Sequence, residues 1–154
     1  MALKPDRVEH LTDLSFFMNE TGERGVIVTH STAGSGAAMD DSNAAVIVAT
    51  GGSGDLPAGL LLNDVVNLDL TRQHINFHKD EVQKGGKVLL LRRGTVVTNM
   101  VEGSPSATIA AGTPAYPMAN GLITPDQDTG ATQIGRFLSV KDADGYVKVE
   151  INIV

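Results

Sequence analysis

The segment from Leu60 to Val101 decides the fold. It begins with Leu60-Leu-Leu-Asn-Asp-Val-Val-Asn-Leu-Asp-Leu70 and, after a polar run, continues with Gly85-Gly-Lys-Val-Leu-Leu-Leu-Arg-Arg-Gly-Thr-Val-Val-Thr-Asn-Met-Val101. Its first part alternates apolar and polar residues from Val66 to Leu70, a period of two that predicts a strand with one solvent-facing side. The pair Gly85-Gly86 predicts a turn, because glycine reaches positive φ without a steric penalty.

The second part of this segment contains two short β-branched and leucine-rich runs. They span Lys87–Arg92 and Thr95–Val101, and Gly94 separates them. We interpret them as two strands of an antiparallel meander with tight turns. Val88, Leu90, Val97 and Val149 are predicted to face the core, with Leu89 in a second packed layer.

Composition limits the classes of protein to consider. The chain has 154 residues, no cysteine and a formal net charge of −6. This length indicates one domain, and the absence of cysteine excludes disulfides and thiolate metal sites. A net acidic domain is a poor candidate for nucleic-acid binding, which depends on Lys and Arg contacts to phosphate. No apolar run approaches the roughly 20 residues of a membrane span.

Further strands are predicted on both sides of the central segment. Val26–His30 and Ala44–Thr50 are short and rich in branched residues. Ile134–Val140 and Tyr146–Val154 are expected to form a hairpin around the turn at Asp142–Gly145, and the last of these runs alternates cleanly. The total of about eight or nine short strands is typical of a small barrel or sandwich. We therefore predict a mainly β fold.

The N-terminal residues 1–20 differ from this pattern. Val8, Leu11, Leu14 and Met18 lie three or four residues apart, which indicates a short amphipathic helix. Two interpretations stay open: a terminal helix packed on its own core, or an arm that docks on a partner. We divide the chain accordingly into an arm, residues 1–20, and a single β-rich domain, residues 21–154.

The polar segment Arg72–Val82 is predicted as a second short helix or as a long functional loop. His74 and His78 have the HxxxH spacing that places two imidazoles on one helix face, as zinc requires. A zinc site needs a third ligand, and no glutamate follows His74. Asp80 and Glu81 are nearby, but so are Arg72 and Lys79, so we favour a solvated surface segment of mixed charge and predict no metal site. A small metal-dependent enzyme using His74, His78 and Asp80 is the less favoured alternative.

Arg92 and Arg93 are adjacent within the leucine-rich run. Alternation along a strand points one of them inward, where we expect a salt bridge or an interface contact. Two adjacent arginines are too few for a nucleic-acid-binding stripe.

The chain from Phe16 to its end resembles the tailed-bacteriophage head decoration, or cement, proteins. Structural motifs distributed over most of the chain carry the resemblance: Phe16-Phe-Met-Asn-Glu20, Glu23-Arg-Gly25, Gly34-Ser-Gly-Ala-Ala38, Gly59–Asp64, Asn67–Glu81, Gly85-Gly-Lys87, Gly94–Thr98, Ile134–Leu138 and Asp144–Val149. The resemblance implies a small β-barrel or β-tulip domain that binds the outside of an assembled capsid and joins neighbouring major capsid protein subunits.

The same resemblance implies no enzymatic step, and we expect no catalytic residue and no cofactor. It implies a virion protein made in the host cytoplasm and located on the outer capsid surface. The family includes monomers, dimers and trimers, and we predict a dimer or trimer for this chain. A tail or fibre component is the alternative, because fold analogy cannot separate these roles. Eight residues are our candidates for partner contact: Leu11, Leu14, Phe16, Phe17, Arg72, His74, Phe77 and His78.

Overall fold

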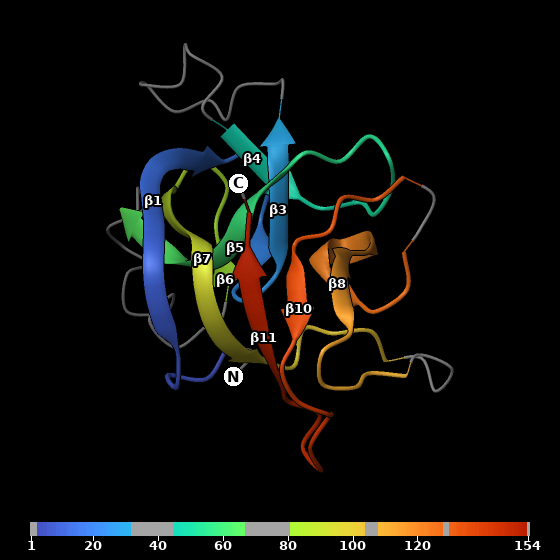
Figure 1. The fold of residues 1–154 in the computed structure, drawn as a ribbon. Coiled ribbons are helices and arrows are strands. Elements are labelled where there is room, and N and C mark those ends of the chain that lie inside the picture. The colour runs from blue at the N-terminus through green and yellow to red at the C-terminus, as the bar shows by residue number, and fades with distance from the viewer. Residues whose placement is uncertain (1–2, 32–44, 67–80, 104–107, 128–129, 154) are drawn as a thin grey trace.

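A computed structural model describes residues 3–31, 45–66, 81–103, 108–127 and 130–153. Over these residues the chain has eleven β-strands and one short 3-10 helix, which confirms the predicted mainly β fold (Figure 1). The elements are β1 (Val8–Met18), β2 (Gly22–Glu23), β3 (Ile27–Ser31), β4 (Ala45–Val48), β5 (Pro57–Val66), β6 (Glu81–Val82), β7 (Lys87–Thr98), β8 (Pro114–Pro117), η1 (Ala119–Gly121), β9 (Ile123–Thr124), β10 (Gly135–Phe137) and β11 (Val147–Asn152).

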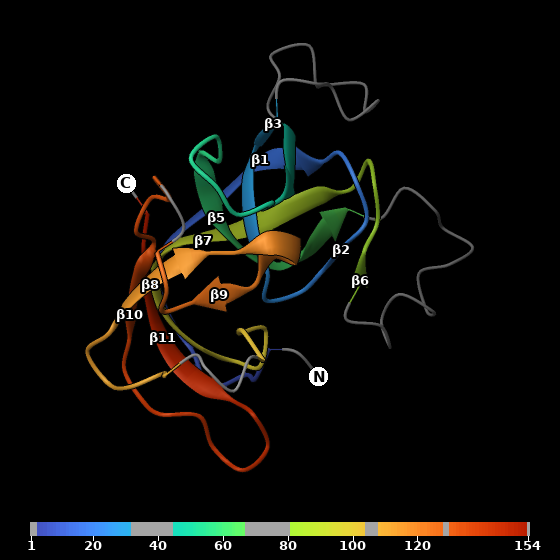
Figure 2. The same ribbon diagram turned by 90° about the vertical axis from the view of Figure 1, so that its right-hand side faces the viewer.

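Nine of these strands form one large sheet, in the order β1-β4-β3-β5-β7-β11-β10-β8-β9. Because β1 also pairs with β7, the strands β1, β4, β3, β5 and β7 form a circuit of paired neighbours. The other four strands extend from β7, so the sheet as a whole is not a closed barrel. Strands β2 and β6 pair separately, on the side of the molecule opposite β10 and β11 (Figure 2).

Strand β7 is the centre of the sheet. It pairs with β1 along most of its length, with β5 through its first half and with β11 through its second half. The prediction that Gly94 separates two strands was wrong, because β7 runs through it. Gly94 has a φ of +154°, and a Cβ there would lie 2.2 Å from the carbonyl oxygen of Val8. The glycine therefore permits a close approach of β1 and does not form a turn.

Residues 8–18 form strand β1, so the predicted N-terminal helix was wrong. The pairing of β1 with β7 shifts register between Glu9 and Leu11, between Leu11 and Thr12, and between Asp13 and Phe16. Such bulges interrupt the alternation of a strand. They explain why Val8, Leu11 and Leu14 lie three residues apart within an extended segment.

The start of the chain continues this contact with β7. Leu3 forms an isolated bridge with Thr98, and the amide of Lys4 donates to the carbonyl oxygen of Val97 at 2.9 Å. The Lys4 ammonium lies 4.2 Å from the centre of the Tyr146 ring. The division into an arm and a domain at residue 20 stays a prediction.

Two clusters of buried apolar side chains form the core. Val88 and Leu90 belong to the cluster inside the strand circuit, and Val149 belongs to the other, as predicted. Leu89 is partly buried against this second cluster. Val97 is half-exposed and its neighbour Val96 is buried, so that prediction was wrong.

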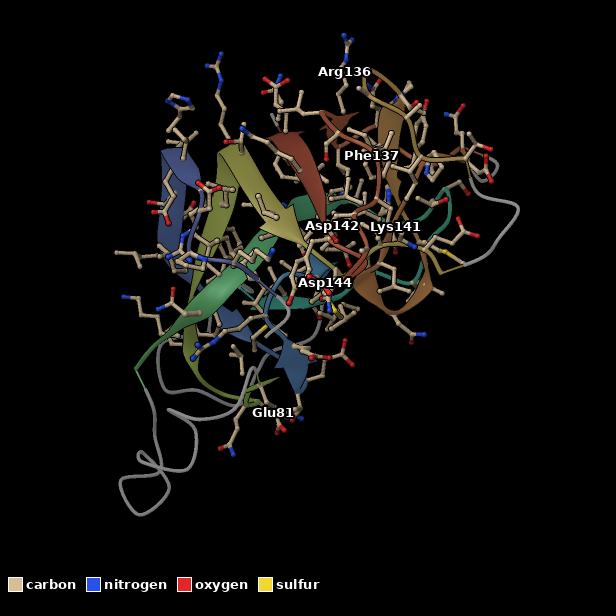
Figure 3. The ribbon with its side chains drawn as sticks, turned by 90° about the horizontal axis from the view of Figure 1, so that it is seen from below. Glu81, Arg136, Phe137, Lys141, Asp142 and Asp144 are labelled. Atoms are coloured by element: carbon tan, nitrogen blue, oxygen red, sulfur yellow. The ribbon has the colours of Figure 1, made fainter. Side chains whose placement is uncertain are left out.

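The predicted C-terminal hairpin is confirmed by the antiparallel pairing of β10 with β11. Its connecting turn is held by Asp142, whose Oδ1 accepts from the amides of Asp144 at 2.9 Å and Tyr146 at 2.8 Å. The turn extends beyond the sheet, and Figure 3 shows it from below with Lys141, Asp142 and Asp144 labelled. On β10, Arg136 is exposed at the rim whereas Phe137 is buried.

Candidate partner-binding surface

Strand β1 exposes an unusual amount of apolar surface. Val8 and Leu11 are each 52% exposed and Leu14 is 47% exposed. In the part of the chain that the structure describes, no strand pairs with the second edge of β1 before Phe17, where β4 begins to pair with it. Unpaired strand edges and exposed apolar side chains both favour association with another polypeptide. We call Val8, Leu11, Leu14 and this edge the β1 surface.

Of the predicted contact residues, Leu11 and Leu14 lie on this surface, whereas Phe16 and Phe17 are half-buried. Phe16 packs against the core cluster inside the circuit, and its ring centre lies 5.4 Å from that of His30. Phe17 pairs with Ala45 of β4 and with Lys87 of β7. The two phenylalanines therefore also join β1 to the rest of the sheet.

The other four predicted contact residues, Arg72, His74, Phe77 and His78, lie outside the described residues, as does Asp80. Of the predicted helix or loop Arg72–Val82, only Glu81 and Val82 are described, and they form β6. Among the described residues, no group of three or more His, Asp or Glu side chains is placed to hold a metal ion.

Polar residues adjoin the β1 surface on the outer face of the sheet. His10, Arg93, Gly94, Thr95 and Glu150 line a pocket of about 350 Å³ where β1, β7 and β11 meet. The directly opposed pairs Val8–Thr95 and Thr95–Glu150 join the three strands at this point. The apolar side chains of β1 thus have a polar border, an arrangement common in protein interfaces.

A second polar group lies near the Phe16–His30 contact. Burial lowers the pKa of His30, and the positive charge of Arg92 lowers it further. Partial burial raises the pKa of Asp13, but hydrogen bonds from Ser15 together with the charge of Arg92 outweigh burial and leave it lowered.

The expectation for the two arginines of β7 is met in part. Arg92 is half-buried and Arg93 is exposed, as alternation predicts. The Nε of Arg92 has no hydrogen-bond partner among the described residues. Within that same part of the chain, the structure gives Arg92 no ion pair, so the expected salt bridge is absent there.

From the sequence we did not predict that Leu11 and Leu14 lie at the exposed edge of a strand. The signal was present in the spacing of Val8, Leu11 and Leu14, but a helix and a bulged strand produce the same spacing.

No described helix is long and apolar enough to cross a membrane. No protein-family model matches the sequence, and no curated protein matches it.

Proposed function

We propose that this chain is a structural virion protein that binds the outer surface of an assembled bacteriophage capsid and stabilises contacts between major capsid protein subunits. The β1 surface is the observation that carries this proposal. Three large apolar side chains exposed on one strand favour association with a partner, because the burial of apolar surface drives most protein association.

The architecture is suited to a cement role. The N-terminal segment is held along β7 from Leu3 to Phe17, so its contact residues are carried on a framework of paired strands. Such preorganisation lowers the entropy that binding must remove. Contacts that are weak for a single copy are sufficient when many copies act on one lattice, because binding favours the assembled state.

The proposed partner is the major capsid protein, and the proposed location is the outer capsid surface after synthesis in the host cytoplasm. We also propose self-association as a dimer or trimer, since decoration proteins often lie on local symmetry axes. Light scattering on the free protein, and on protein released from virions, tests the oligomeric state. A monomer in both samples would remove this part of the proposal.

The capsid proposal is tested by co-sedimentation with expanded, emptied capsids and with unexpanded procapsids of the phage that encodes the chain. We expect saturable binding to expanded capsids. The double variant Leu11→Ser and Leu14→Ser should keep its fold and lose most of this binding. The matched control is Leu56→Ser, which alters a 65% exposed leucine outside β1.

Equal binding by the double variant and the control would place the docking surface elsewhere. Absence of wild-type binding to capsids would overturn the capsid proposal. Density for this chain on the tail alone, in cryo-electron microscopy of the virion, would support the alternative of a tail or fibre component.

A further inference from the structure

A second pocket lies beside η1. Its volume is about 520 Å³. Residues from four separate parts of the chain line it: Thr50, Gly51, Glu102, Pro117, Met118, Ala119, Thr124, Asp126 and Gln127. This volume lies within the range of small-ligand pockets and exceeds that of one large side chain. None of its residues belongs to the β1 surface.

The walls of this pocket are held by backbone contacts. A Cβ on Gly51 would lie 2.7 Å from the backbone nitrogen of Ala119, so the loop and the 3-10 turn pack without a gap. Asp55 fixes the same loop, because its carboxylate accepts from the amides of Thr50 at 2.9 Å and Gly51 at 2.7 Å. The amide of Gly121 in η1 also donates to the carbonyl oxygen of Ala49, in the same loop, at 2.9 Å. The pocket is therefore preformed.

The polar lining of the pocket includes the half-buried Glu102, the buried Thr124 and the exposed Asp126. The Thr124 hydroxyl donates to Oε2 of Glu102 and accepts from the amide of Asp126 at 3.1 Å. This shared hydroxyl places the half-buried Glu102 carboxylate near the start of the Asp126 side chain. The other side of the pocket is apolar and consists of Pro117, Met118 and Ala119.

No described cation neutralises these two carboxylates. Lys141 contacts Glu102, but its Nζ donates to the backbone carbonyl oxygen of Glu102 at 2.9 Å and not to the carboxylate. In the described part of the chain, the ion pairs are Lys4–Asp142 and Arg7–Glu9, neither of which includes Glu102 or Asp126. A partly buried carboxylate without a counter-ion attracts a positively charged group.

We propose that this pocket binds a basic side chain, with arginine preferred, of a partner polypeptide. The aliphatic stem would lie against Met118 and Pro117, and the guanidinium would reach Glu102 and Asp126. Arginine is preferred over lysine because its planar head donates in two directions at once. The proposal does not depend on the capsid proposal, since it concerns different residues and is tested on the free protein.

The test titrates the protein with Nα-acetyl-arginine amide and follows backbone amide shifts by NMR. We expect saturable shifts at Gly51, Thr124 and Asp126 that weaken with added salt. Nα-acetyl-citrulline amide has nearly the same shape without the charge, and it should bind at least about tenfold more weakly.

Two substitutions locate the site. Glu102→Gln keeps an acceptor for the Thr124 hydroxyl and should weaken arginine binding at least about tenfold, and Asp126→Asn should weaken it as well. Glu23→Gln, at an exposed position of β2 that lines neither pocket, removes the same charge and should leave binding unchanged. Unaltered amide spectra away from the pocket establish that each variant is folded.

Three results would overturn the proposal. The first is equal binding of the arginine and citrulline probes. The second is equal weakening by Glu102→Gln and Glu23→Gln, which would indicate general charge attraction. The third is a folded Glu102→Gln variant that binds the arginine probe as the wild type does.

Discussion

Leu3 pairs with Thr98 at the far end of β7, and only 7% of the Leu3 side chain is exposed. A residue so near the N-terminus thus belongs to a core cluster, the same one that contains Val149. Terminal residues are poorly ordered unless contacts with the rest of the domain hold them in place. Here a backbone bridge and the burial of an apolar side chain both hold the segment.

Leu3→Ala should accordingly destabilise the domain. We expect a loss of at least about 2 kcal/mol in the free energy of unfolding, since the substitution removes buried methyl groups and leaves a cavity. Urea denaturation measures this loss. Leu11→Ala, at a 52% exposed position, should change stability by no more than about 0.5 kcal/mol. Equal effects of both substitutions would show that Leu3 does not contribute to the core.

Leu90→Ala tests the cluster inside the strand circuit. Leu90 is fully buried on β7, between the pairing partners Asp13 of β1 and Leu61 of β5. The expected loss of stability is about 2–5 kcal/mol. The exposed Leu56 provides the matched control, and Leu56→Ala should be nearly neutral. An unchanged melting temperature for Leu90→Ala would mean that the register of β7 is different.

Gly94→Ala should disrupt the contact between β1 and β7. The added methyl group would meet the carbonyl oxygen of Val8, so the strands must separate or the backbone must deform. We expect lower stability and faster hydrogen exchange of β1 amides than of β11 amides. Gly103→Ala, where nothing lies within 4 Å of the added atom, should change neither quantity. Unchanged exchange in Gly94→Ala would contradict the observed packing.

His30 should make stability depend on pH near neutrality. Partial burial, followed by the charge of Arg92, lowers the pKa of His30 below its ordinary value of 6.5. On acidification the unfolded chain therefore takes up a proton at His30 before the folded chain does. This contribution to stability is complete above pH 6.5 and is lost as pH falls from there through the lowered pKa.

Unfolding free energies measured between pH 5 and pH 8 test this expectation. The loss of stability on acidification should be smaller in His30→Gln than in the wild type. A His30→Gln profile parallel to that of the wild type would remove His30 as the cause.

The local patterns of this sequence determined much of the secondary structure. The alternation from Tyr146 to Val154 predicted a strand, because side chains of a strand alternate between its two sides. The structure confirms it as β11, Val147–Asn152, with alternating buried and exposed residues. Gly85 predicted a turn, and its φ of +85° agrees with the conformational freedom of glycine. Both features depend on residues that are adjacent in the sequence, so they can be predicted from the sequence alone.

Tertiary structure alone determined which segments that are distant in the sequence lie side by side. Val8, Leu11 and Leu14 have a helical spacing, but pairing with β7 satisfies the backbone of their segment as a bulged strand. Gly94 has the pattern of a turn, yet the closeness of Val8 determines its role. Thr124 reaches Glu102 across 22 residues of sequence. Strand pairing and shared hydrogen bonds join distant residues, and no local pattern of side chains specifies which distant residue will be the partner.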